Sequence, residues 1–285
     1  MILLVLNLGC HQTPVKDTAA LVDTDTTDTD TTDTDADADT DTDTDTDTDT
    51  VTGAPDCREE YVDATLISFE SVTGEINSVD PATGATSVFS ILSGMPKDAN
   101  LNSSAFRADA TAVVSDATHR QLVSVDPCSG VVTVMGATGV GALCGVAYGP
   151  GGHLYGLDGE NNQLVLLDEV TGAATVIGGL GFDLGTCGLA YDCVNDQLMA
   201  VDGTNSRIFK VDPATGLGFD AISTDVAFGS VGAEYDPRDE TILASTGSAF
   251  YRIEITTGAG TRIAPLDGEG NWDDLAYLTA AIECP

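Results

Sequence analysis

Acidic residues recur at one place in a repeating sequence pattern, and they have the clearest potential for chemistry. Each closes a predicted strand, and in two repeats an asparagine follows three positions later. The acids are Glu70, Asp116, Asp158 and Asp202, and the asparagines are Asn161 and Asn205. Carboxylate and amide oxygens are the ligands that Ca²⁺ prefers. With Trp272 in a neighbouring loop, these residues predict a candidate binding face that would suit a divalent cation or a polar ligand.

The same residues also form good turns, because Asp-Gly at 158–159 and 202–203 is a common hairpin sequence. Both interpretations stay open, and the metal ligands remain unassigned. The sequence contains no HExxH, no phosphate-cradling loop and no recognisable Ser-His-Asp arrangement. We therefore assign no catalytic residue and keep Ca²⁺ as the one cofactor to test.

A second acid recurs in a five-residue motif that appears five times at intervals of 42 to 46 residues. The copies are DPATG at 80–84, DPCSG at 126–130, DEVTG at 168–172, DPATG at 212–216 and EITTG at 254–258. Asp accepts a backbone N–H in a turn, Pro presets φ, and Gly supplies a positive φ. The motif is thus predicted to be a hairpin turn, and its period indicates a propeller or a solenoid.

Each repeat divides into four short strands. The first strands include GVAY (145–148), GLAY (188–191) and DLAY (274–277), with bulky side chains on one face and alanine on the other. Sheets of this kind stack bulky face on small face around an axis. The chain is therefore predicted to be an all-β propeller over residues 56–285, closed by overlap of its N- and C-terminal strands. Five four-stranded blades fit the period, and six fit if residues 55–75 hold a degenerate blade.

The cysteines predict disulfides in an exported protein, since six remain when Cys10 is set aside. Cys57 and Cys284 flank the folded region, so we expect them to pair where the ring closes. Cys144 and Cys187 hold equivalent places in adjacent repeats and are expected to pair as well. Cys128 and Cys193 are left without an assigned partner.

The N-terminus, MILLVLNLGC, resembles the end of a bacterial lipoprotein signal peptide, in which a small residue precedes a lipidated cysteine. The resemblance implies that residues 1–10 are a signal segment and that Cys10 carries the lipid. Residues 11–55 are rich in Asp and Thr, and such a segment is expected to be a disordered spacer. This organisation predicts a protein tethered to the membrane of the bacterial cell envelope, on its extracytoplasmic side.

The charge of the chain excludes nucleic acids as partners. Its formal net charge is -36, with 46 acidic against 10 basic residues. Such a surface repels phosphate backbones. A cation, a glycan or a basic protein surface is the better partner, and we expect a monomer.

The pattern L-x-x-V-D-P-x-T-G and the string GLAYD resemble the bacterial YVTN/NHL-like and quinoprotein-like β-propellers over roughly residues 60–280. The single tryptophan argues against a docked quinone, which uses one tryptophan per blade in the resembling proteins. Two hypotheses follow. The first is a non-enzymatic, lipid-anchored propeller that presents a binding face to a protein or a glycan. The second is a Ca²⁺-dependent hydrolase that resembles propeller lactonases, which hold a metal with Glu, Asn and Asp.

Overall fold

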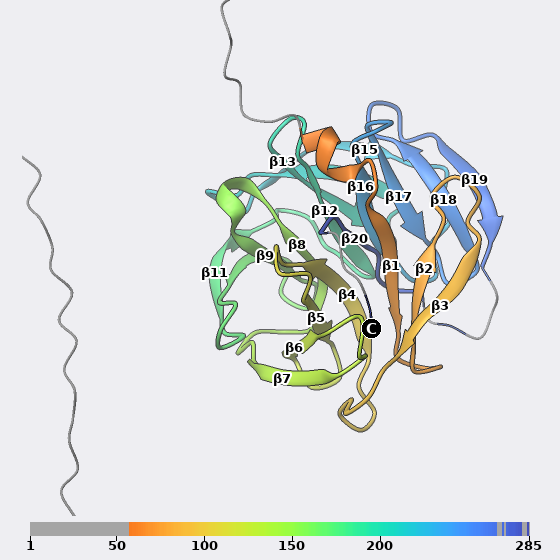
Figure 1. The fold of residues 1–285 in the computed structure, drawn as a ribbon. Coiled ribbons are helices and arrows are strands. Elements are labelled where there is room, and N and C mark those ends of the chain that lie inside the picture. The colour runs from red at the N-terminus through yellow and green to blue at the C-terminus, as the bar shows by residue number, and fades with distance from the viewer. Residues whose placement is uncertain (1–56, 267–269, 271, 281–283, 285) are drawn as a thin grey trace, which may run out of the picture. The chain divides into compact units, whose positions relative to one another are not determined.

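The structure is a computed structural model that describes residues 57–266, 270, 272–280 and 284. The predicted signal segment with Cys10 and the predicted spacer lie outside the described residues. The described part folds into five four-stranded antiparallel sheets, which Figure 1 shows arranged around a common centre. The predicted five-bladed β-propeller is therefore confirmed.

We number the blades in the order in which the chain forms them. Blade 1 contains β20 (Ala276–Leu278), β1 (Thr65–Glu70), β2 (Glu75–Val79) and β3 (Thr86–Ile91). Blade 2 contains β4 (Leu101–Phe106), β5 (Ala112–Asp116), β6 (Gln121–Val125) and β7 (Val132–Ala137). Blade 3 contains β8 (Leu143–Tyr148), β9 (Leu154–Asp158), β10 (Gln163–Leu167) and β11 (Ala174–Gly179).

Blades 4 and 5 repeat this order. Blade 4 contains β12 (Cys187–Asp192), β13 (Gln197–Asp202), β14 (Arg207–Val211) and β15 (Gly218–Ser223). Blade 5 contains β16 (Gly232–Asp236), β17 (Thr241–Ser245), β18 (Ala249–Glu254) and β19 (Gly260–Pro265). Two short 3-10 helices, η1 (Cys57–Tyr61) and η2 (Pro150–Gly152), complete the described elements.

The ring closes through blade 1, which draws its first strand from the C-terminal end of the chain. Strand β20 pairs antiparallel with β1, with Leu66 opposite Tyr277. This pairing joins the two ends of the folded region in one sheet, as the overlap predicted. It also removes the free edge that β1 would otherwise expose.

The core consists of five apolar clusters, one at each contact between neighbouring blades. At the contact between blades 2 and 3, Ala105 packs with Val146 and Tyr148. At the next contact, Ala147 packs with Leu189 and Tyr191. The small face of one blade thus meets the bulky face of the next, which is the stacking that the first strands predicted.

The recurring five-residue motif forms the hairpin between the third and fourth strands of each blade. In blade 1 the Asp80 carboxylate accepts the backbone N–H groups of Ala82 and Thr83 at 2.8 and 3.1 Å. The Gly84 N–H then donates to the Asp80 carbonyl, and Gly84 has a φ of 69°. The two backbone donors hold the pKa of the Asp80 carboxyl below its usual value. The recurring acid is therefore a turn cap.

The glycine of this motif also sets how closely two blades approach. A Cβ on Gly216 of blade 4 would lie 2.6, 2.8 and 2.9 Å from the O, C and N atoms of Gly178 in β11 of blade 3. Nearby, the Gly218 N–H donates to the Leu180 carbonyl across the same contact. The hairpin turn thus docks on the preceding blade, backbone against backbone.

The disulfides correct one prediction. Cys57 bonds to Cys193, and Cys284 bonds to Cys128, so the expected Cys57–Cys284 pair is wrong. The two ends of the folded region already meet through the β1–β20 pairing, and each end is bonded instead to a loop of another blade: blade 4 for Cys57 and blade 2 for Cys284. Cys144 bonds to Cys187, the pair expected from their equivalent places.

Three disulfides are typical of proteins that fold outside the reducing cytoplasm. Within the described residues, no helix combines the length and the apolar character needed to cross a bilayer.

Candidate functional site

The acids of the predicted binding face lie where their second and third strands join, but they are buried in their own hairpins. The Asp158 side chain is fully buried. Its carboxylate accepts the N–H groups of Gly141 and Asn161 and the side-chain amides of Asn161 and Gln163 at 2.7 to 3.1 Å. Burial opposes ionisation, but these donors outweigh it and hold the pKa of Asp158 below its usual value.

The other three acids make contacts of the same kind. The Asp202 carboxylate accepts a hydrogen bond from the Asn205 side-chain amide and pairs with the Arg207 guanidinium, whose Nη2 atom lies 2.7 Å from Oδ2. The Asp116 carboxylate accepts a hydrogen bond from the Gln121 side-chain amide, and its Oδ2 atom lies 2.6 Å from His119 Nδ1. The Glu70 carboxylate accepts hydrogen bonds from the Ser68 hydroxyl and the Trp272 backbone N–H at 2.9 and 3.0 Å.

These contacts turn the side chains of the predicted binding face inward, toward the protein. Asn161 and Asn205 each turn back to their own aspartate, and the Trp272 side chain is buried rather than displayed. The carboxylates of Asp116, Asp158 and Asp202 therefore brace their own hairpins. The Glu70 carboxylate instead holds the backbone of the neighbouring loop at Trp272. Among the described residues, no group of three or more His, Cys, Asp or Glu side chains is arranged to hold a metal ion.

A different set of residues converges at the axis of the ring. A cavity of about 280 Å³ is lined by the segments that enter the first strands of all five blades. The polar side chains at this axial mouth are Asn100, Asn102, Thr186, Ser230 and Asp273. It lies at the same end of the blades as the hairpins described above, because those hairpins contact the inter-blade loops through Gly141 and Asp183.

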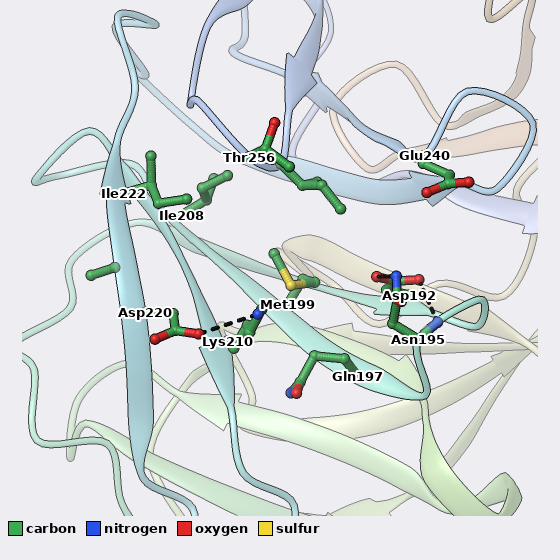
Figure 2. Close-up of a pocket in the computed structure, with 12 residues that line it drawn as sticks. Asp192, Asn195, Gln197, Met199, Ile208, Lys210, Asp220, Ile222, Glu240 and Thr256 are labelled. Carbon is green, nitrogen blue, oxygen red and sulfur yellow. Dashed lines mark hydrogen bonds and ion pairs between the residues drawn. The ribbon is translucent and has the colours of Figure 1, made fainter.

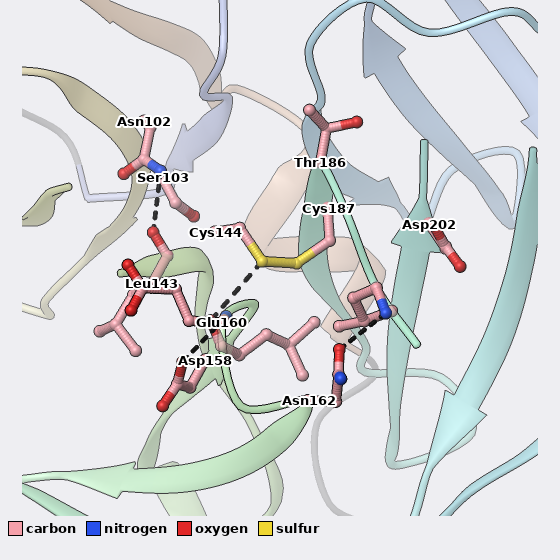
Figure 3. The surroundings of a disulfide bond; sticks show 12 residues. Asn102, Ser103, Leu143, Cys144, Asp158, Glu160, Asn162, Thr186, Cys187 and Asp202 are labelled. Carbon is pink, nitrogen blue, oxygen red and sulfur yellow. Dashed lines mark hydrogen bonds between the residues drawn. A yellow bond between two sulfur atoms is a disulfide. The ribbon is translucent and has the colours of Figure 1, made fainter. Parts of the chain in front are cut away.

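Hydrogen bonds and a disulfide fix the wall of the axial mouth in place. The Asn102 amide donates to the Leu143 carbonyl at 2.8 Å and its carbonyl accepts the Ser115 hydroxyl at 2.9 Å. Beside Asn102, the Cys144–Cys187 disulfide joins the first strands of blades 3 and 4, as Figure 3 shows. A wall held in this way is pre-formed for binding.

Asp273 is the acidic residue of the axial mouth. Burial, together with the nearby Glu70 carboxylate, raises the pKa of Asp273 to about 6, against an opposing hydrogen bond from Ser230. Its Oδ1 atom is buried and has no hydrogen-bond partner among the described residues. An unsatisfied buried acceptor is unfavourable, so a donor group brought to this carboxyl would be stabilising.

The opposite end of the axis is narrower. Tyr61 of η1 packs edge-on against Tyr277 there, with ring centroids 5.2 Å apart. Together with Tyr148, Tyr191 and Glu234, these rings line a space of only about 100 Å³. The hydroxyls of Tyr148 and Tyr191 donate outward to Glu169 and Asp196. The tyrosines thus belong to the core, and the wider opening to the axis is the axial mouth.

Sequence reasoning named Trp272, the neighbour of Asp273, but did not predict the axial mouth as a site. Asn100 and Thr186 directly precede their first strands, Ser230 lies two residues before its strand, and Asn102 lies within its strand, so the four residues form no common sequence motif. The available signal is the repeat itself: residues just before each first strand must meet at the axis of a propeller.

The fold and this mouth define a five-bladed β-propeller with an axial cavity. No protein-family model matches the chain, and no curated protein matches its sequence. Solved structures do match it. A chain of a nidogen/laminin complex has a TM-score of 0.53 at 11% identity, over 76% of this chain and 100% of that one.

Two bacterial structures are also similar. A protein of unknown function from Bacteroides thetaiotaomicron has a TM-score of 0.51 at 17% identity, over 70% of this chain and 55% of that one. Virginiamycin B lyase from Staphylococcus aureus has a TM-score of 0.46 at 14% identity, over 70% and 69% of the two chains. At such identities, the two structures with TM-scores above 0.5 show a likeness of fold alone.

Proposed function

We propose that this protein is a non-enzymatic, lipid-anchored binding protein of the bacterial cell envelope whose axial mouth holds a glycan. The observation that carries the proposal is the convergence of polar side chains from four of the five blades on one pre-formed cavity. Its polar side chains are neutral amides and hydroxyls, with Asp273 as the one acid. Sugar hydroxyls donate and accept in the same way, and a neutral ligand avoids repulsion by a chain of net charge -36.

The alternative, a Ca²⁺-dependent hydrolase, loses its main support. It needed free carboxylates on one face, whereas Asp116, Asp158 and Asp202 are buried and hydrogen-bonded within their own hairpins. Replacing those donors with a metal would leave the hairpins unbraced.

Replacing Asp273 tests the glycan site. On an array of neutral bacterial oligosaccharides, we expect saturable binding that EDTA does not reduce. Asp273→Ala should weaken it about tenfold, because the loss of a charged acceptor costs about 1.5 kcal/mol or more. Asp183→Ala is the matched control, since Asp183 is exposed in an inter-blade loop at the same end of the blades. Binding abolished by EDTA, or equal in both variants, would contradict the proposal.

Replacing Cys10 tests the anchor separately. The full chain, expressed in bacteria fed an alkyne-labelled fatty acid, is expected to take up label in the membrane fraction. Cys10→Ala should lose the label, and Gln12→Ala should keep it. Label retained by the Cys10→Ala variant would show that the lipid is attached elsewhere, and an unlabelled wild type would refute the anchor.

A further inference from the structure

A second cavity, of about 700 Å³, lies between blades 4 and 5, away from the axial mouth. Figure 2 shows its two walls: Ile208 and Ile222 from blade 4 on one side, and Glu240 from blade 5 across the gap. No residue of the axial mouth lines it. The two cavities are therefore separate sites.

The cavity exists because blade 4 breaks the repeat at one position of its fourth strand. In the other four blades the residue at the bulge of this strand is large and packs into the inter-blade core. These residues are Phe89, Met135, Ile177 and Ile263. Blade 4 has Ala221 there, which is exposed and belongs to no core cluster. The volume that a large side chain fills elsewhere is left open.

At the next position of the fourth strand, blade 4 again differs from the other blades, here with a large residue in place of a small one. The other blades have a small residue after the bulge: Ser90, Gly136, Gly178 and Ala264. Blade 4 has Ile222, which is half-buried against the core of this contact. In blade 4 the large residue therefore follows the small one. The apolar side chain of Ile222 lines the cavity between blades 4 and 5, where the other blades have a small residue.

The floor of the cavity is apolar and its rim is charged. Met199 and Ile208 form the floor and are almost fully buried, and Ile255 closes the side from blade 5. On the rim, Lys210 pairs with Asp220 at 3.2 Å. Glu240, also on the rim, forms an ion pair with Arg58 of η1.

The charges around the cavity select the ligand. Asp192, Asp220 and Glu240 contribute three carboxyl groups to the lining. Lys210 and Arg58 pair with Asp220 and Glu240, which leaves one net negative charge and no unpaired cation among these groups, so an anionic ligand would meet net repulsion. We propose that the gap between blades 4 and 5 is a binding site for a small apolar molecule that carries an amine. Its volume lies within the range of small-molecule sites, and its apolar floor would bury the ligand body.

Two probes of equal shape and opposite charge test this site. The full-length protein is titrated with 1-naphthylmethylamine and with 1-naphthoate, and binding is followed by naphthyl fluorescence. The amine is expected to bind saturably and at least about tenfold more tightly than the acid, because like charge disfavours the wrong ligand. Asp220→Asn should reduce that preference several-fold.

A pocket-filling variant locates the site. The double substitution Ala221→Ile with Ile222→Gly installs the Ile177–Gly178 pair of blade 3, which the same fold accommodates. It should weaken binding of the amine at least about tenfold with the thermal midpoint retained, while Asp273→Ala should leave binding unchanged. If the double variant is poorly folded, Met199→Phe fills the floor instead.

Three results would overturn the proposal: equal affinity for the two probes, amine binding that survives both filled variants, or amine binding lost in Asp273→Ala. Self-association of the wild type, but not of the double variant, in sedimentation experiments would also overturn it, since a second copy of the chain would then occupy the gap.

Discussion

Replacing Gly216 with alanine is expected to lower the free energy of unfolding by about 4 kcal/mol. Gly216 has a φ of 78°, which costs an alanine about 1 to 2 kcal/mol. The new methyl group would also meet three backbone atoms of Gly178 at 2.6 to 2.9 Å. Backbone of a neighbouring sheet cannot swing aside as a side chain does, so overpacking adds about 1 to 3 kcal/mol.

Gly74 provides a matched control for this prediction. It has a φ of 74°, and nothing lies within 4 Å of the Cβ that an alanine would add. Gly74→Ala should therefore show only the backbone cost of about 1 to 2 kcal/mol. Urea unfolding of both variants, followed by circular dichroism, gives the comparison. Equal losses would mean that the motif glycine serves its own turn and not the contact between blades.

This comparison bears on how much the sequence predicts. The turn chemistry of DPATG and the positive φ of its glycine follow from residue types, and so do the four-stranded blades, whereas the period allowed either five or six of them. The docking of Gly216 on Gly178 does not follow, because the two residues belong to different repeats and nothing in their types pairs them. Local hairpins are encoded locally, whereas the contacts between blades appear only when the ring is built.

The disulfides show the same limit. Cys144 and Cys187 were predictable because they occupy the same place in adjacent repeats, and adjacent first strands lie side by side. Cys57 and Cys284 lie in no repeat, so no equivalent position in another blade indicates a partner. Their partners, Cys193 and Cys128, lie in loops of blades 4 and 2. The sequence therefore could not identify the disulfide partners of Cys57 and Cys284.

The predicted binding face shows a further limit of sequence reasoning. From the sequence alone, a carboxylate at the end of a strand can either brace a hairpin turn or bind a ligand. Its burial and its hydrogen-bond partners decide between the two roles. Asp158 is fully buried, and donors from its own hairpin and from the inter-blade loop at Gly141 already occupy its carboxylate. By contrast, the residues that do stand out, Ala221 and Glu234, depart from an otherwise constant repeat. Comparing the repeats position by position would have found both.

Glu234 is the stronger of these departures. At its position in the first strand the other blades have alanine, at Ala105, Ala147, Ala190 and Ala276. Its carboxylate lies beside the narrow end of the axis and accepts the backbone N–H groups of Tyr235 and Tyr277 at 2.8 and 3.3 Å. Burial, with a smaller contribution from Asp236, raises its pKa to about 7, although the two donors oppose the shift.

This pKa makes the stability of the protein fall as the pH rises. Between about pH 4.5 and 7, the folded state keeps a proton on Glu234 that the unfolded chain releases, so the free energy of unfolding decreases across this interval. Above pH 7 the folded state contains the ionised carboxylate, at a total cost of about 3 kcal/mol. Asp273, whose pKa is raised to about 6, shifts stability in the same direction.

Replacing Glu234 with glutamine is therefore expected to stabilise the protein by about 3 kcal/mol at pH 8 and to have little effect at pH 4. The measurement is guanidinium unfolding of both proteins across this range. Asp168→Asn is the control: backbone hydrogen bonds from Thr171 and Val170 lower the pKa of Asp168, so its loss should be harmful at pH 8 and still largely harmful at pH 4, because that stabilisation is lost only as the pH falls through the lowered pKa. A Glu234→Gln effect that is the same at both pH values would place an ordinary, freely ionised carboxylate at the axis, and the break in the repeat would then have no electrostatic consequence.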